Sequence, residues 1–201
     1  MRASPMIRVC GACLLTLLLP AVAGAEDKAP AAKPAAAAAA APAASPMPKP
    51  SADLEAFMKG FEGNWKCDTK FAANAFGPGS PEMTVKSTVK IKKDLDGFWY
   101  RGDFELKKTK AMPGIKGYFF VGYDPGAKQA LITTIDGMGG LATGSGAISG
   151  DSVTFLEDGY MSGAKVKSRE TMEKRQKGLY HKFEVDAGTG FQLVGEDTCQ
   201  K

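Results

Sequence analysis

The segment from residue 117 to residue 140 constrains the fold of this chain more strongly than any other. Two runs of β-prone residues, Tyr118–Tyr123 and Ala130–Ile135, flank the five residues DPGAK at 124–128. A proline presets φ at the second position of a tight turn, and the glycine after it accepts a positive φ, so the segment predicts two antiparallel strands joined by a hairpin turn. The other segments of the domain repeat this design, which predicts one antiparallel meander.

Two predicted strands upstream of this hairpin alternate between apolar and polar residues. In the strand at 82–91, one face consists of Met83, Val85, Ser87, Val89 and Ile91, with threonines and lysines between them. In the strand at 98–106, the apolar face consists of Phe98, Tyr100, Gly102, Phe104 and Leu106. Alternation with a period of two indicates a sheet with one face in the core and the other in water.

About ten strands are expected in all. The first begins at Asn64, and the later ones lie at 138–149, 152–157, 164–175, 179–186 and 190–200, with turns at 150–151, 158–159, 177–178 and 188–190. An open meander leaves two unpaired edges, and pairing of the first strand with the last removes both. We therefore predict an all-β fold, a closed antiparallel up-and-down β-barrel. An open sheet curled over a helix is the alternative.

A short helix is expected before the first strand. Ser51 can cap it, and Leu54, Phe57, Met58 and Phe61 lie on one side at helical spacing. The helix opens the domain predicted at residues 51–201, which is long enough to bury a core.

Residues 1–25 have the parts of a Sec-type signal peptide. Arg2 and Arg8 supply positive charge, residues 9–22 are apolar, and an A-x-A cleavage site ends at Ala25. The apolar run is too short to span a bilayer, and no other stretch is long and apolar enough. We therefore expect cleavage after Ala25 and a soluble mature protein, periplasmic or secreted, with no transmembrane segment.

Residues 26–50 consist almost entirely of alanine, proline and lysine. Such a segment cannot bury a core, so a disordered linker is expected. Removal of the signal peptide takes away two arginines and no acids, and the formal charge falls from +4 to +2. This charge is too small to indicate nucleic acid or an anionic membrane as a partner.

The cysteines of the mature chain are Cys67 and Cys199, since Cys10 and Cys13 leave with the signal peptide. An even pair in an oxidising compartment is most simply a disulfide. Both residues fall on the core side of the first and last predicted strands. A disulfide between them would lock the seam of the barrel.

Several motifs carry a resemblance to known proteins. Gly63-Asn64-Trp65 after a short helix is similar to the G-x-W opening of lipocalin-like (calycin) barrels. A longer pattern comprises LDGFW at 95–99, MPG at 112–114, GYD at 122–124, TIDGMG at 134–139 and Gly146. This pattern resembles the uncharacterised bacterial family called domain of unknown function 1579. The resemblance implies a lipocalin-like barrel and brings no established activity, ligand or catalytic residue.

The single histidine, His181, shares its strand face with Leu179, Phe183 and Val185, so it is expected to point into the barrel. One interpretation is a haem ligand, as in the nitrobindin-like haem-binding barrels. The other is an interior histidine bonded by a neighbour such as Glu170 or a tyrosine. A two-residue turn at 177–178 would place Lys174 opposite His181 and Glu170 opposite Val185.

The inner face of the barrel is the expected binding surface. Its candidate ligand-binding residues are Val85, Val89, Phe98, Tyr100, Phe104, Phe119, Glu170, His181 and Phe183. The sequence has no G-x-S-x-G elbow and no phosphate loop, so no catalytic residue is assigned. The leading hypothesis is a non-catalytic barrel that binds a small hydrophobic or amphipathic ligand and needs no cofactor. The alternatives are a haem protein using His181 and a structural envelope-interaction module with a filled barrel.

Overall fold

The computed structural model describes residues 47–201. Within them, α1 (Ala52–Met58) precedes the strands β1 (Gly63–Phe71), β2 (Met83–Asp94), β3 (Trp99–Leu106), β4 (Ile115–Asp124), β5 (Gln129–Asp136), β6 (Leu141–Gly146), β7 (Ile148–Ser149), β8 (Ser152–Met161), β9 (Ala164–Arg175), β10 (Gly178–Asp186) and β11 (Gln192–Gln200). The predicted signal peptide and most of the predicted linker lie outside the described residues. No helix within 47–201 has the length and apolar character needed to cross a membrane.

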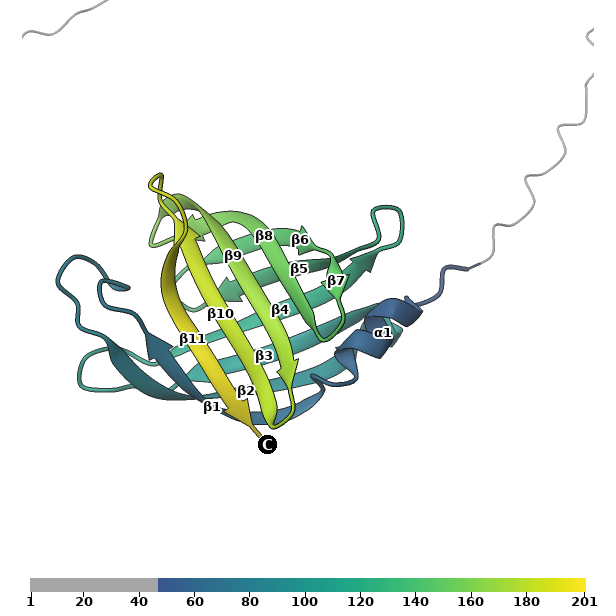
Figure 1. The fold of residues 1–201 in the computed structure, drawn as a ribbon, viewed down its shortest axis with the longest axis horizontal. Coiled ribbons are helices and arrows are strands. Elements are labelled where there is room, and N and C mark those ends of the chain that lie inside the picture. Colours follow the sequence, from purple (N-terminus) through teal and green to yellow (C-terminus); the bar gives the residue numbers. More distant parts are fainter. Residues whose placement is uncertain (1–46) are drawn as a thin grey trace, which may run out of the picture. The chain divides into compact units, whose positions relative to one another are not determined.

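The strands form a closed antiparallel barrel (Figure 1). Each strand pairs with the next along the chain, except that the short β7 pairs only with β8 and the ring continues from β6 directly to β8. Pairing of β1 with β11 closes the ring. The predicted all-β, up-and-down barrel is therefore confirmed.

The seam of the barrel carries the predicted disulfide. Cys67 of β1 stands directly opposite Cys199 of β11, and the two are joined by a disulfide bond. Both cysteines are buried in the core. The covalent bond and the strand pairing therefore fix the same junction.

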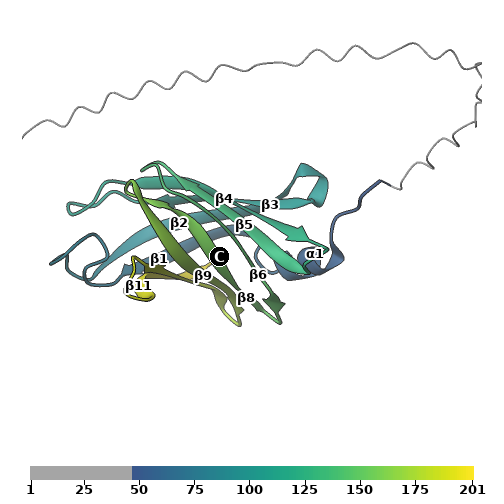
Figure 2. The same ribbon diagram turned by 90° about the horizontal axis from the view of Figure 1, so that it is seen from above.

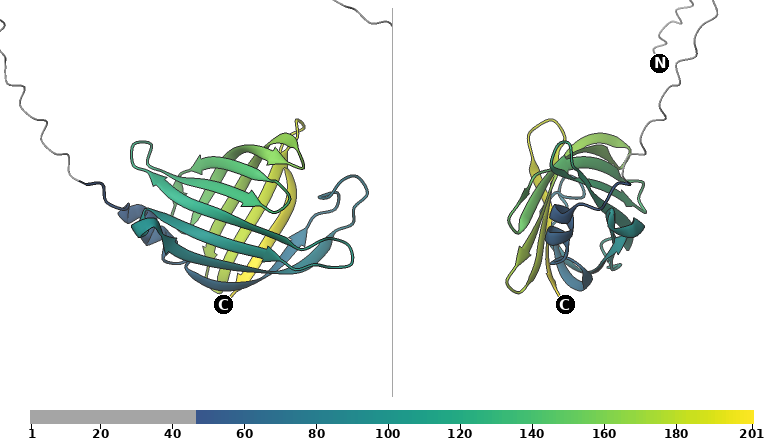
Figure 3. Two further views of the ribbon diagram at one scale, coloured as in Figure 1. Left: turned by 180° about the vertical axis from the view of Figure 1, so that it is seen from behind. Right: turned by 90° about the vertical axis from the view of Figure 1, so that its right-hand side faces the viewer.

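Helix α1 fills one end of the barrel, as the end-on view shows (Figure 3). The Ser51 hydroxyl accepts a hydrogen bond from the backbone N–H of Leu54 at 3.3 Å, so the predicted N-cap is confirmed. Leu54, Phe57, Met58 and Phe61 are all buried and pack in one core with strand residues such as Tyr100 and Phe155. In the view from above, α1 lies beside the ends of β4, β5 and β6 (Figure 2).

Helix α1 and the turn after it, residues 52–61, form what we call the helical plug. Trp65 of the Gly63-Asn64-Trp65 motif is bonded to the last residue of this plug. The indole N–H of Trp65 donates a hydrogen bond to the backbone carbonyl of Phe61 at 2.8 Å, and the ring is buried. The first strand and the plug therefore share one buried polar contact, which has no water to compete with it.

Several predicted turns differ from those in the structure. Asp158-Gly159 lies inside β8, and the turn that follows uses Ser162 and Gly163. In the central hairpin, the positive φ falls on Lys128 at 54° rather than on Gly126. Asp124 nevertheless stabilises this turn, because its carboxylate accepts a hydrogen bond from the Gly126 N–H at 2.8 Å.

The register of β9 with β10 is shifted by two residues from the prediction. Gly178 pairs with Arg175, so the turn is formed by residues 176–177, and His181 stands opposite Met172 rather than Lys174. Glu170 stands opposite Phe183 rather than Val185. A shift of two residues keeps every side chain on its face, and the predicted inward direction of His181 and Glu170 is therefore correct.

A β-bulge in β11 reverses the faces of its first residues. The register with β10 breaks between Phe183 and Glu184, which pair with Gly195 and Leu193. Leu193 is 43% exposed, although it lies six residues before the buried Cys199 and an unbroken alternation would put both on the core side. The extra residue at the bulge is the physical reason, because it shifts the alternation by one.

We expect the disulfide to contribute substantially to stability. The double variant Cys67→Ala/Cys199→Ala should lower the free energy of unfolding by about 3–5 kcal/mol, because the bond closes a loop that spans 132 residues of sequence. Urea unfolding followed by circular dichroism measures the change. Reduced wild-type protein should unfold like the variant, and an unchanged urea midpoint in both would contradict the expectation.

Candidate functional site

The barrel encloses a cavity of about 730 Å³. Its floor lies towards the helical plug, where Phe61 contributes to the lining. Phe76, Met138, Ser162 and Ala187 also line it, and they belong to the connections at the end of the barrel opposite α1. The cavity therefore extends from the plug to the loops at the other end.

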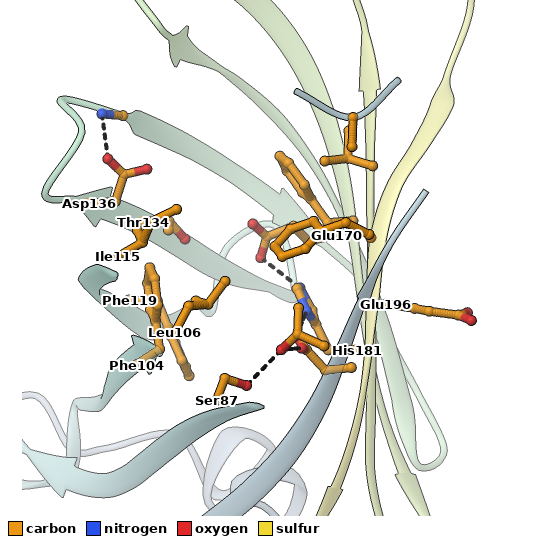
Figure 4. Close-up of a pocket in the computed structure, with 18 of the residues that line it drawn as sticks. Ser87, Phe104, Leu106, Ile115, Phe119, Thr134, Asp136, Glu170, His181 and Glu196 are labelled. Carbon is orange, nitrogen blue, oxygen red and sulfur yellow. Dashed lines mark hydrogen bonds and ion pairs between the residues drawn. The ribbon is translucent and has the colours of Figure 1, made fainter. Parts of the chain in front are cut away.

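One wall of the cavity is apolar and aromatic (Figure 4). It is formed by β3, β4 and β5, with Phe104, Leu106, Ile115, Phe119 and Ile132. Such a wall can bury the hydrocarbon part of a ligand at about 25 cal/mol per Å² of apolar surface removed from water.

Two glycines hold the aromatic rings of this wall in place. Phe119 pairs across the strands with Gly102, and Phe104 pairs with Gly117. A Cβ atom at Gly102 would lie 2.0 Å from the Phe119 ring, and one at Gly117 would lie 2.3 Å from the Phe104 ring. Each ring therefore occupies the space above the glycine opposite it, which no other residue type would leave free.

The facing wall carries a cluster of polar side chains among apolar ones such as Phe71, Met172 and Phe183, and we call it the polar wall. Thr69, Ser87, Glu170, His181 and Asp197 come from β1, β2, β9, β10 and β11, which are consecutive around the barrel, and all five line the cavity. Figure 4 shows Glu170 and His181 on the side opposite Phe104 and Phe119, with Ser87 between the two sides, where β2 pairs with β3. The cavity thus has two chemically different walls.

A chain of hydrogen bonds connects these polar residues. The Thr69 hydroxyl donates to one carboxylate oxygen of Asp197, so the Ser87 hydroxyl, 2.7 Å away, donates to Thr69. The second oxygen of Asp197 lies 2.8 Å from Nδ1 of His181, and Nε2 of His181 lies 3.5 Å from Glu170. The imidazole therefore stands between two carboxyl groups.

His181 is positively charged at neutral pH in this environment. Burial alone would lower its pKa, but the hydrogen bonds and charges of Asp197 and Glu170 outweigh burial and raise the pKa from 6.5 to about 10. The side chain is 32% accessible, and it lines the cavity. An interior histidine bonded by a neighbouring acid is the arrangement found, with Asp197 as the closer partner.

One contact of His181 argues against a haem iron. Because Nδ1 is bonded to Asp197, iron would have to bind Nε2, and Nε2 faces the carboxyl group of Glu170 at 3.5 Å. In the part of the chain that the structure describes, no group of three or more metal-ligating side chains occurs. Haem ligation by His181 stays a prediction that this geometry does not favour.

A second buried carboxyl group, Glu157 of β8, lies close to the polar wall. It is only 4% exposed, it accepts a hydrogen bond from Ser168 at 3.0 Å, and its other oxygen has no hydrogen-bond partner among the described residues. Burial and the charge of Glu170 raise the pKa of Glu157 well above its usual range. Its protonated form is therefore favoured in the folded protein.

Six of the nine residues predicted to bind a ligand line the cavity: Val89, Phe104, Phe119, Glu170, His181 and Phe183. Val85 and Tyr100 point inward as predicted, but they are packed in the interior and do not contribute to the lining. Phe98 was wrongly placed on the inner face and is 36% exposed. It ends the 3-10 turn Leu95–Gly97 with helical φ and ψ, so the strand alternation begins only after it.

The sequence interpretation missed Asp197 and Glu157. Asp197 lies two residues before Cys199 and so shares its inward face, and Glu157 lies two residues after the buried Phe155. Strand parity would have found both.

The fold and the cavity define the class of this protein: a closed antiparallel β-barrel with a two-walled internal cavity. The chain belongs to the family described as protein of unknown function (DUF1579), whose model matches residues 51–179, well over half of the chain. The predicted family is thereby confirmed.

Several solved protein chains are similar to this one in fold. The crystal structure of Rv2717c from M. tuberculosis is similar to this chain with a TM-score of 0.57 at 10% sequence identity, over 76% of this chain and 99% of that one. At this identity the likeness concerns the fold alone. No curated protein shows significant sequence similarity to the chain.

The charge of His181 should make stability depend on pH. Because folding raises the pKa of His181, the protonated imidazole stabilises the fold fully below pH 6.5. This stabilisation is lost as the pH rises towards 10. Between these values, the free energy of unfolding of wild type should fall by about 2–5 kcal/mol more than that of His181→Gln. Urea unfolding at pH 6, 8 and 10 measures this, and parallel pH curves for the two proteins would contradict it.

Glu157 should also make stability fall as the pH rises, but here because its ionised form is destabilising. Its raised pKa means that ionisation costs folding free energy above pH 4.5, its ordinary value, and the cost grows with pH. Glu157→Gln should therefore raise stability at pH 7 by about 1–3 kcal/mol and leave it nearly unchanged at pH 4. Thermal unfolding at both pH values tests this. The exposed Glu105→Gln serves as the control that should change neither.

Proposed function

We propose that this protein is an exported, non-catalytic barrel that binds a small hydrophobic or amphipathic molecule. The observation that carries the proposal is the internal cavity of about 730 Å³, with an aromatic wall facing a polar one. Pockets for small ligands have volumes of about 300–1,000 Å³ and combine apolar walls with a few placed polar groups. The cavity has this size and this composition.

Export to the periplasm or the medium is supported by two independent features. Residues 1–25 have the pattern of a signal peptide. Cys67 and Cys199 form a disulfide, and such bonds persist mainly in oxidising compartments.

The chemistry of the polar wall supports binding rather than catalysis. A histidine must be deprotonated to act as a general base, whereas His181 has a pKa of about 10 and is already protonated at neutral pH. The hydroxyls of Ser87 and Thr69 are bonded to each other and to Asp197, whose other carboxylate oxygen is bonded to the protonated His181, and no deprotonated imidazole lies beside them. Neither hydroxyl is therefore activated as a nucleophile.

A second candidate function, a structural or envelope-interaction module, is favoured by one feature of the outer surface. Tyr118, Ile135, Leu141 and Tyr160 are direct cross-strand neighbours on β4, β5, β6 and β8, and each is between 40% and 52% exposed. A continuous row of exposed apolar side chains is typical of an interaction surface. If the cavity binds no apolar molecule, this row becomes the leading candidate.

Two neighbouring threonines provide a matched test of the cavity. Thr134 lines it, whereas Thr133 alternates to the outer face of β5. Thr134→Phe should place a ring in the cavity and weaken binding of the neutral fluorescent probe N-phenyl-1-naphthylamine by about tenfold or more, because the probe loses the space it needs. Fluorescence titration of purified protein measures the affinity.

Thr133→Phe adds the same ring outside the barrel and should bind the probe like wild type. Circular dichroism spectra of both variants should match that of wild type. Binding that is equal in all three proteins would place the probe outside the cavity and contradict the proposed function.

A further inference from the structure

The ionisable groups that line the cavity are almost all acidic. Within the described residues, the lining includes Asp136, Glu170, Glu196 and Asp197, one histidine, and no lysine or arginine. Glu196 accepts a hydrogen bond from the Tyr180 hydroxyl at 2.9 Å and points away from the other labelled side chains in Figure 4. Asp136 accepts bonds from backbone N–H groups of its own loop. The acids that face the interior are therefore Glu170 and Asp197.

These two acids differ in how many hydrogen-bond partners their carboxylate oxygens have. One oxygen of Asp197 accepts from Thr69 and the other is bonded to His181. Glu170 has only the 3.5 Å contact with His181 among the described residues, and no closer hydrogen bond. Its side chain is 12% accessible, and it lines the cavity. Glu170 thus presents an acceptor to whatever occupies the cavity.

The polar wall as a whole carries an excess of negative charge. One imidazolium, His181, is shared between two carboxylates, Asp197 and Glu170. The nearby buried Glu157 is favoured in its protonated form and adds no further charge. In a partly dehydrated interior such an excess is costly, and a positive group that approaches it is attracted more strongly than in water.

We propose that the cavity prefers ligands with a cationic amine at one end and an apolar body, and that Glu170 is the residue that accepts the amine. This inference rests on the proposed binding function and names the ligand class. The apolar body of such a ligand packs against the wall of Phe104 and Phe119, and the amine faces the polar wall. A ligand that ends in a carboxylate would instead meet Glu170 and Asp197 with the same sign of charge.

Three probes of equal chain length test the preference: dodecylamine, 1-dodecanol and dodecanoate. Isothermal titration calorimetry at pH 7, below the micellar concentrations, measures their affinities for the purified, disulfide-bonded protein. Dodecylamine should bind about tenfold or more tightly than dodecanol, and dodecanoate should bind most weakly. Dodecanoate binding as tightly as dodecylamine would overturn the ligand class and leave the proposed function standing. Failure of all three probes to bind would overturn the proposed function itself.

Variants of Glu170 test its role. Glu170→Gln should reduce the affinity for dodecylamine to about that for dodecanol and leave the affinity for dodecanol unchanged, whereas Glu170→Asp keeps the charge and should retain the preference. Glu105→Gln, on the outer face of β3, is the control that should change nothing. An equal loss for all three probes in Glu170→Gln would assign Glu170 a structural role and overturn the proposal.

Discussion

The pairing of β1 with β11 is the interaction on which both the fold and the cavity depend. It removes the two open edges of the meander, and the Cys67–Cys199 disulfide locks it. The same seam runs through the polar wall, because the hydrogen bond from Thr69 to Asp197 joins β1 to β11. An open sheet would separate Ser87 and Thr69 from Asp197 and His181. Closure of the barrel therefore assembles the candidate site as well as the core.

One part of the barrel interior is filled by packed side chains, and the rest is an open cavity. At one end, the side chains of α1 fill the space and pack with Tyr100 and Phe155. Beyond the plug, the rings of Phe104 and Phe119 lie over Gly117 and Gly102, against the wall rather than across the barrel. A larger residue at either glycine would push a ring towards the centre. Two small residues therefore preserve space that a purely structural barrel would fill.

Much of the architecture could be predicted from the sequence, because strand alternation and turn chemistry are local signals. The N-cap at Ser51 followed from residue type and helical spacing, the inward direction of His181 from strand parity, and the disulfide from the cysteine count, the expected compartment and strand parity. The predictions that were wrong depend on a single backbone irregularity each. Phe98 has helical φ and ψ and precedes the alternation of β3, whereas a bulge before Gly195 shifts the alternation of β11 by one, and neither has a distinctive residue pattern. The partners of His181 depend on strand register, which the sequence specifies only through the turn at 176–177.

The family match accounts for only part of the polar wall. It covers Thr69, Ser87 and Glu170 but ends at residue 179, before His181 and Asp197. The match therefore covers most of the barrel, including Glu170, the proposed amine acceptor. The imidazole of His181 and the carboxylate of Asp197, which set the charge around Glu170, come from β10 and β11 beyond the match. Without His181, Glu170 and Asp197 would repel each other on the same wall of the cavity. The last two strands thus make a pair of interior acids compatible with a stable fold while leaving Glu170 incompletely satisfied.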